Sequence, residues 1–217
     1  MSDLENPAPS RLAGARSWHA QPIAAIAFIL VAAVATGALT SWAQGALPDQ
    51  FAPLANSAGT WTVLTVLLVA ATRCGPVLGG VLGLLAFYLL LVGYALAAAA
   101  QGLSYSVGPA NIWAIVAIVV GPVIGVCASW LRQSTDDRLV AIGAAVIGGV
   151  LIGEGVHGLT RIADTTSVGW WIGSVVVGLG VLGWTTARRL RQRASRTLAI
   201  TLTAVVGGAL WALYGAL

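Results

Sequence analysis

Charge is scarce in this chain of 217 residues, of which only 8% are Asp, Glu, Lys or Arg. Lysine is absent, so all eleven basic residues are arginine, and there are only two cysteines and one methionine. With 58% hydrophobic residues and a mean hydropathy of +0.89, this composition excludes a soluble globular domain. The arginines accompany no nucleic-acid-binding motif, so we expect no nucleic-acid partner. The chain is instead predicted to lie in a lipid bilayer.

The shortage of polar side chains also leaves little for catalysis. No Ser-His-Asp set, P-loop or Gly-rich nucleotide fingerprint is evident. Glu154 and His157 form one E-x-x-H pair, whereas a di-iron bundle needs two and further carboxylates. Cys74 and Cys127 lack the additional ligands that zinc requires. We therefore expect no enzyme activity, no metal and no cofactor.

Apolar sequence is abundant. Seven apolar runs, each near the length of about 20 residues that crosses a bilayer, lie at 22–43, 54–72, 76–98, 111–131, 139–158, 168–187 and 197–216. They predict an all-α, polytopic transmembrane helix bundle of about seven spans, which forms a single transmembrane helical domain over 22–217. The polar segment 1–21, rich in Pro, Ser and Ala, is predicted to be a disordered cytoplasmic tail.

The arginines predict how the bundle is oriented. Ten of the eleven fall before the first span or in loops on one side, and only Arg161 falls on the other. The positive-inside rule then places the N-terminus in the cytoplasm and the C-terminus outside a multi-pass protein of the cell membrane. Five arginines of one loop are predicted to contact anionic lipid headgroups at the cytoplasmic face, with docking of a cytoplasmic partner as the alternative: Arg188, Arg189, Arg191, Arg193 and Arg196.

Small residues recur at four-residue spacing, as at Gly79 and Gly83 or at Gly169 and Gly173. Such ladders let helix backbones approach closely in lipid. We favour packing within the chain, and contact with a second copy or another membrane protein is the alternative. Tryptophans near predicted span ends, including Trp61, are typical of interfacial anchors. For Trp170, stacking on a ligand is the alternative interpretation.

The span at 139–158 carries Glu154 and His157 inside otherwise apolar sequence. A carboxylate within a membrane costs on the order of 2.5–3.5 kcal/mol, so Glu154 needs a polar neighbour, water or a proton. His157 lies three residues after it, and Arg161 four residues after that, so all three share roughly one helical face. We expect Glu154 to pair with one of these two neighbours. A structural polar contact between helices and a functional site are equally compatible with this pattern.

The segment that joins the first two spans is the second informative stretch. A helix that began only at Thr60 would be too short to cross the hydrocarbon. Either the helix starts near Leu54, or irregular backbone at 55–59 dips below the surface, where protein or a water-filled cavity must satisfy it. Asn56 and Ser57 are good N-cap residues for both geometries. A helix N-terminus that faces an outer cavity would favour an anionic or carbonyl group.

These observations support two hypotheses of different classes. In the first, the chain binds or transports a small solute through an outward-facing polar pocket, and the candidate ligand-binding residues are Gln44, Asn56, Ser57, Tyr94, Glu154, His157 and Arg161. In the second, it is a structural or assembly protein without a ligand, and its polar residues serve helix packing. Tyr105 and Asn111 map to the same half of the membrane and could line the same cavity.

Several short motifs carry a resemblance. Leu54-Ala55-Asn56-Ser57 followed by Trp61, together with the pair Gly153-Glu154, resembles a bacterial family of multi-spanning integral membrane proteins of unknown function. The resemblance covers most of 22–217 and implies no established activity or catalytic residues. The outer polar pocket and the size are also similar to the substrate-capture components of energy-coupling-factor vitamin transporters. Those typically have six spans, where seven are predicted here.

Overall fold

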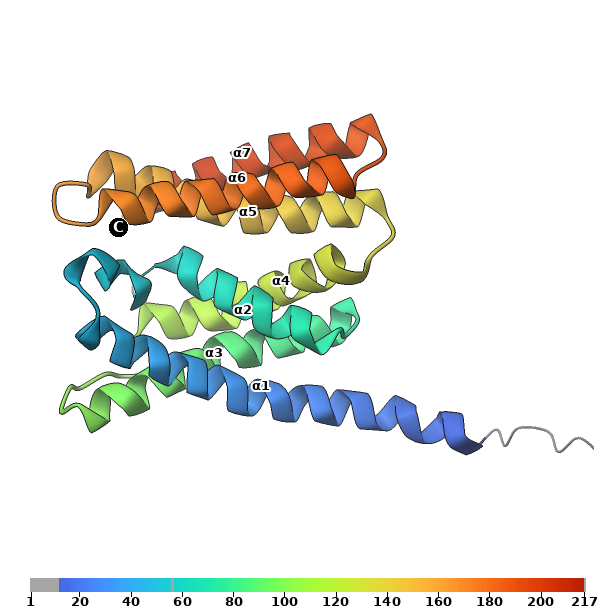
Figure 1. Ribbon diagram of the computed structural model, residues 1–217, viewed down its shortest axis with the longest axis horizontal. Helices are drawn as coiled ribbons and strands as arrows, with labels where there is room; N and C mark the ends of the chain where they lie inside the picture. Colours follow the sequence, from blue (N-terminus) through green and yellow to red (C-terminus); the bar gives the residue numbers. More distant parts are fainter. Residues whose placement is uncertain (1–11, 56, 217) are drawn as a thin grey trace, which may run out of the picture.

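The computed structural model describes residues 12–55 and 57–216, which form seven α-helices and one 3-10 helix and contain no strand (Figure 1). Six of the helices are long and apolar enough to cross a membrane, and α2 is shorter. The all-helical polytopic bundle is therefore confirmed. Its elements are α1 (Leu12–Ala46), η1 (Asp49–Ala55), α2 (Ala58–Thr72), α3 (Pro76–Ala100), α4 (Ile112–Gln133), α5 (Asp137–Arg161), α6 (Val168–Arg188) and α7 (Arg193–Ala216).

Helix boundaries follow local capping chemistry. Asn111 and Asp136 are the N-caps of α4 and α5, and their side chains accept hydrogen bonds from backbone N–H groups of the first turn. Pro76 opens α3 directly after Gly75, where its missing N–H costs nothing. Helix α1 begins at Leu12, before the predicted span, and contains Pro22. Residues 1–11 of the predicted tail lie outside the described residues.

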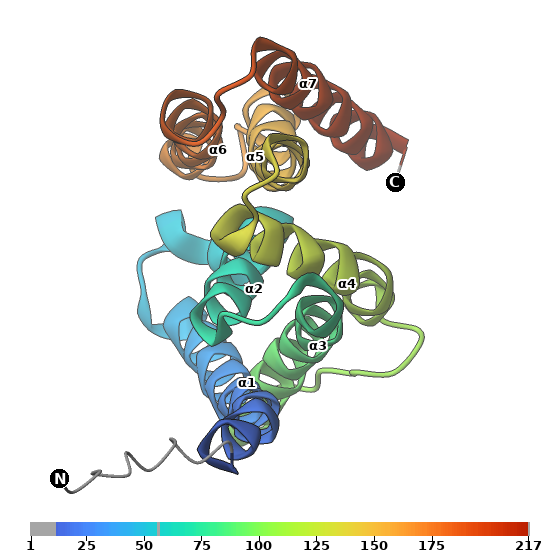
Figure 2. The same cartoon turned by 90° about the vertical axis from the view of Figure 1, so that its right-hand side faces the viewer.

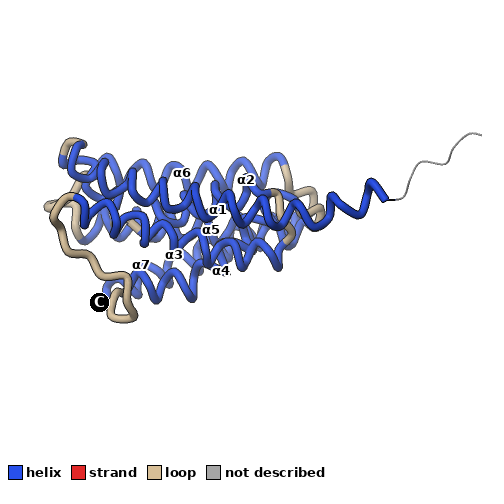
Figure 3. Tube along the Cα trace, turned by 90° about the horizontal axis from the view of Figure 1, so that it is seen from below, coloured by secondary structure: helices blue, strands red, loops and turns tan. Residues whose placement is uncertain are grey.

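The helices run along one axis, and the loops gather at the two ends of the bundle (Figure 3). One end holds Arg73 between α2 and α3, Arg132 in the last turn of α4, Arg138 in the first turn of α5, and the arginines at and around the α6–α7 connection. The opposite end holds η1, the α3–α4 connection, Arg161 and the end of α7 (Figure 1). We call these the arginine end and the η1 end.

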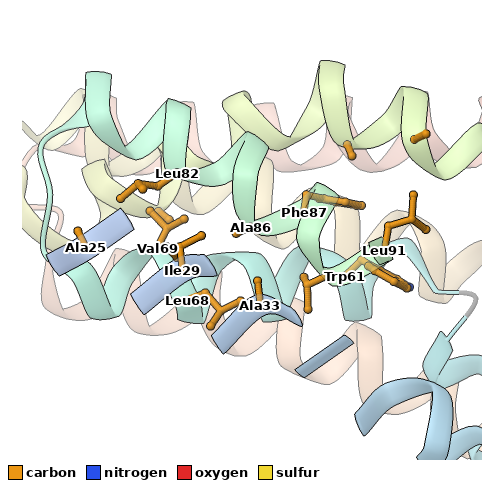
Figure 4. Packing of buried hydrophobic residues seen from close by; sticks show 14 residues of the cluster. Ala25, Ile29, Ala33, Trp61, Leu68, Val69, Leu82, Ala86, Phe87 and Leu91 are labelled. Carbon is orange, nitrogen blue, oxygen red and sulfur yellow. The ribbon is translucent and has the colours of Figure 1, made fainter. Parts of the chain in front are cut away.

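The bundle consists of two groups of helices, α1–α4 and α5–α7 (Figure 2). The core of the first group is built around Trp61, which is 1% exposed and stacks on Phe87 and Trp113 with ring centroids 5.9 and 6.2 Å away (Figure 4). Trp61 is thus a core residue rather than the interfacial anchor that its position at a span end predicted. In the second group, α5 packs against both α6 and α7, and it also contacts α2 and α4.

Glycines set the close crossings within each group. A Cβ on Gly83 would collide with the backbone of Gly121 and Gly125, and one on Gly153 would lie 2.5 Å from the carbonyl oxygen of Gly207. Dispersion between closely approaching backbones holds such crossings together in lipid. The ladders at 79–83 and 121–125 therefore pack within the chain. Gly173 differs, because a Cβ added there would meet nothing within 4 Å.

Candidate functional site

The site begins at the N-terminus of α2, which starts at Ala58 and not near Leu54. With 15 residues, α2 is about 22 Å long, which is shorter than the other α-helices. It is preceded by η1, at the η1 end of the bundle, and by Ser57, whose backbone is extended. Neither predicted geometry is observed as stated, because Ala55 belongs to η1, Ala58 and Gly59 belong to α2, and of the described residues only Ser57 between them is extended. Ser57 is the N-cap, and its Oγ accepts a hydrogen bond of 3.1 Å from the Thr60 N–H. Asn56 lies outside the described residues.

Glu154 satisfies the N–H groups that this helix start leaves free. Its Oε2 accepts hydrogen bonds from Ser57 Oγ and from the Gly59 N–H, both at 2.7 Å, and its Oε1 accepts one of 2.6 Å from the Ala58 N–H. The first N–H groups of a helix have no partner within it and carry partial positive charge. A carboxylate that is only 3% exposed is therefore stabilised by three donors and by the α2 dipole.

Two further residues shape this contact. A Cβ on Gly59 would lie 2.7 Å from Glu154 Oε2, so a larger residue there would require the carboxylate to shift from its present position. From α7, the Tyr214 hydroxyl donates a long hydrogen bond of 3.4 Å to Glu154 Oε1. Glu154 thereby links α2 of the first helix group to both α5 and α7 of the second.

The expected pairing of Glu154 with a neighbour on its own helix is wrong. The His157 ring lies 5.0 Å from the Tyr214 ring, and its Nδ1 is buried without a hydrogen-bond partner. The Arg161 guanidinium is at the exposed end of α5, 5.3 Å above the Trp211 ring. Two preorganised backbone N–H groups and the hydroxyls of Ser57 and Tyr214 occupy the carboxylate oxygens instead.

A cavity of about 590 Å³ adjoins this contact, between η1 and α2 of one helix group and α5 and α6 of the other. Its volume lies in the usual range of small-molecule sites, which is roughly 300–1,000 Å³. Ser57 and Gly59 line it, so the α2 start forms part of its wall. The remaining lining residues are Gln50, Phe51, Leu54, Thr60, Val63, Leu64, Leu151, Ser167, Gly169, Trp170, Gly173, Ser174 and Val177.

Of the predicted ligand-binding residues, the structure brings Ser57 and Glu154 together, and Ser57 also lines the cavity. Gln44 and Tyr94 form a separate pair between α1 and α3, in which the Tyr94 hydroxyl donates a hydrogen bond of 2.6 Å to Gln44 Oε1. The Tyr105 ring packs edge-on against Tyr94. Asn111 caps α4, so the polar residues of this end do not form one cluster.

Sequence reasoning missed most of the cavity wall. Ser174, whose Oγ donates a 2.9 Å hydrogen bond to the Leu151 carbonyl, lies in an apolar run with no distinguishing signal. Trp170, for which stacking on a ligand is the alternative interpretation, lines the cavity. Tyr214 lies near the end of the last apolar run, and nothing in the sequence distinguishes it from an ordinary aromatic residue at a span end. Among residues 12–55 and 57–216, no cluster of three His, Cys, Asp or Glu side chains could hold a metal ion.

At the arginine end, some of the arginines hold the helix groups together. Arg189 donates hydrogen bonds of 2.9 and 3.0 Å to the carbonyls of Leu131 and Ser134, at the end of α4. The Asp137 carboxylate accepts hydrogen bonds from the backbone N–H groups of Arg191 and Gln192, just before α7. Arg188, Arg191 and Arg193 are exposed.

Comparison with known proteins identifies the family of this chain. Residues 16–217 match the family described as "Family of unknown function (DUF6518)". The chain belongs to this family. No curated protein and no solved structure matches it. Family membership thus agrees with the expected resemblance to membrane proteins of unknown function, and any activity must be argued from the site itself.

Proposed function

We propose that this family member is a multi-pass membrane protein that binds a small molecule in the cavity between η1, α2 and α6. The observation that supports this proposal is the cavity itself. It adjoins the start of α2, which the buried Glu154 carboxylate of α5 holds through hydrogen bonds to Ala58 and Gly59. Sites between two groups of helices, beside an interrupted helix, are where membrane proteins commonly bind solutes.

The proposal includes an orientation. The cavity lies at the η1 end, opposite the end of the bundle that holds nearly all of the described arginines. If those arginines lie in the cytoplasm, the cavity belongs to the outer half of the membrane. The exposed Arg188, Arg191 and Arg193 are then available to anionic headgroups of the inner leaflet, because they are not held in the α4 contact as Arg189 is.

The alternative function is structural, and one observation favours it. Each Glu154 oxygen already accepts two hydrogen bonds from within the chain, as expected of a residue that fastens helices together. Such a residue could serve a protein with no ligand. The two functions make different predictions for a side chain added to the cavity wall. It should abolish ligand binding if the cavity is a binding site, and it should change only the stability if the protein has no ligand.

The experiment fills the cavity without touching Glu154. Gly173→Leu adds a side chain on the cavity wall, where a Cβ meets nothing within 4 Å. Gly180→Leu is the matched control, since Gly180 has the same open surroundings on the same helix and does not line the cavity. Purified protein is screened by thermal shift against a panel of small metabolites and lipids, and hits are followed by uptake into proteoliposomes.

We expect compounds that raise the melting temperature of the wild type and of Gly180→Leu but not that of Gly173→Leu. Uptake of such a compound would identify a transporter, and binding without uptake a receptor or carrier. Compounds that stabilise all three proteins equally would refute the cavity as the binding site and leave the structural function.

A further inference from the structure

The chemistry of the cavity wall restricts what it can bind. None of the described lining residues carries a charge. Glu154, which contacts the lining residues Ser57 and Gly59, directs its oxygens at Ser57, Ala58 and Gly59, so its charge is compensated by α2 rather than offered to the cavity. A charged ligand would lose its hydration and gain no counter-charge, which is costly in a membrane.

Most polar side chains of the wall lie at the η1 end of the cavity, beside the apolar Phe51 and Leu54, and Ser174 is the exception further along α6. Gln50, Ser57 and Ser167 lie at the η1 end, on the segments that precede α2 and α6. Val63, Leu64 and Val177 lie further along these helices, toward the middle of the bundle. From Ser167 to Val177 the wall extends about 15 Å at the helical rise. A ligand that matches it has a polar head at the η1 end and an apolar body directed into the membrane.

Two hydroxyls of the wall remain able to bind, that of Thr60 in the first turn of α2 and that of Ser174 further along α6. The Thr60 side chain is half-exposed and makes no hydrogen bond within the described chain. Ser174 Oγ donates to the Leu151 carbonyl, which leaves its lone pairs free to accept from a ligand. These groups suit a hydroxyl or carbonyl, because both can exchange hydrogen bonds without carrying charge.

The cavity also faces the side of the bundle. Figure 2, a view along the helices, shows η1 and α6 on the same flank, and Phe51 and Val177 are 37% and 49% exposed there. Exposed apolar side chains on the flank of a membrane protein face lipid. Access from the bilayer suits a molecule that is already dissolved in it.

We propose that the cavity takes an uncharged, single-chain amphipath, with a hydroxyl- or carbonyl-bearing head at the η1 end and its apolar chain along α6, drawn from the adjoining membrane leaflet. This inference rests on the proposed function, because it concerns the same cavity. It adds the charge of the ligand, its orientation and its route.

The test compares three probes with a chain of twelve carbons and different heads: monododecanoylglycerol, dodecyl phosphate and dodecyltrimethylammonium. Binding to the full chain in nanodiscs of defined phospholipid is measured by native mass spectrometry. We expect the glycerol ester to bind, and Gly173→Leu to weaken it about tenfold or more while Gly180→Leu leaves it unchanged. Thr60→Val should weaken the glycerol ester about fivefold, the usual effect of one lost hydrogen bond.

The orientation is read from quenching of Trp170 on the cavity wall, as the difference between the wild type and Trp170→Phe. Because Trp170 lies three residues from Ser167 and seven from Val177 on α6, a glycerol ester brominated beside its carbonyl should quench Trp170 more strongly than one brominated at the end of its chain. Nanodisc phospholipid brominated in its chains should not quench it, and stronger quenching by the chain-end bromine would reverse the orientation. Equal quenching by the phospholipid would mean that bulk lipid fills the cavity, and would overturn the inference.

The two proposals fail differently. If a charged probe binds as tightly as the glycerol ester and Gly173→Leu still blocks it, the cavity remains a binding site and the uncharged class is wrong. If Gly173→Leu affects no probe and no metabolite, the proposed function itself is wrong. Circular dichroism and the melting temperature of Gly173→Leu, compared with Gly180→Leu, show that any lost binding comes from a folded protein.

Discussion

The Ser57 hydroxyl donates a hydrogen bond of 2.7 Å to the Glu154 carboxylate and so joins α2 to α5 across 97 residues of chain. Because Ala58 and Gly59 donate to the same carboxylate, the start of one helix is closed by an acidic side chain from the other helix group. This contact also forms part of the cavity wall through Ser57 and Gly59. It therefore couples the stability of the bundle to the shape of the proposed site.

Replacing Glu154 tests this contact most directly. Glu154→Leu leaves the Ser57 hydroxyl and two backbone N–H groups buried without an acceptor, and should lower the free energy of unfolding by about 3 kcal/mol or more. Glu154→Gln keeps one acceptor oxygen and should cost less, about 1–2 kcal/mol. Unfolding in mixed micelles measures both. Ser129→Ala is the control, since that buried hydroxyl bonds only to a carbonyl of its own helix; equal losses in all three variants would contradict the assignment.

Ser57 acts twice, as N-cap of α2 and as donor to Glu154. Ser57→Ala should therefore lower the free energy of unfolding by about 1–2 kcal/mol, which is at the upper end of the effects measured when an N-cap residue is replaced. Ser167→Ala is matched to it, because Ser167 caps α6 through a 3.4 Å hydrogen bond from the Trp170 N–H and has no carboxylate partner. In a double-mutant cycle, Ser57→Ala and Glu154→Gln should show a coupling energy. Strict additivity would mean that their hydrogen bond contributes nothing.

The sequence was sufficient to predict the bundle, because long apolar runs separated by arginine-bearing loops have few other solutions in lipid. It also identified Glu154 as a residue in need of a partner and Ser57 as a cap. Their contact was not predictable, since helical spacing reveals only neighbours on the same helix, whereas Ser57 approaches from another span. The predicted pairing of Glu154 with a neighbour on its own helix was wrong, because Arg161 lies at the exposed end of that helix and the α2 N–H groups are already oriented toward Glu154.

Trp61 and the cavity show the same limit. The position of Trp61 near a span end favoured an interfacial anchor, but α2 begins one turn before it and is surrounded by α1, α3 and α4, which buries the ring. The cavity wall combines residues of η1, α2, α5 and α6, most of them apolar. Apolar residues look alike in a membrane sequence whether they face lipid, a helix or a ligand.

The glycine crossings predict opposite effects for the same substitution. Gly83→Ala should destabilise the bundle by at least about 1–3 kcal/mol, because the added Cβ meets the backbone of Gly121 and Gly125 and the helices must separate. Gly180→Ala meets nothing within 4 Å and should be neutral or stabilising by up to about 1 kcal/mol through helix propensity. Melting temperatures in one detergent compare them. A stable Gly83→Ala would show that α3 and α4 pack less closely than described.

The orientation of the bundle is tested by cysteine labelling. Cys74 and Cys127 are first replaced, because both are free thiols. Single cysteines are then introduced at Ser104, in the exposed α3–α4 connection of the η1 end, and at Gln192, in the exposed connection between α6 and α7. If the arginine end is cytoplasmic, a membrane-impermeant maleimide applied to intact cells should label position 104 and not 192, and permeabilised cells should label both. Labelling of 192 alone in intact cells would reverse the orientation, place the cavity in the cytoplasmic leaflet, and redirect the search for its ligand to molecules of that leaflet.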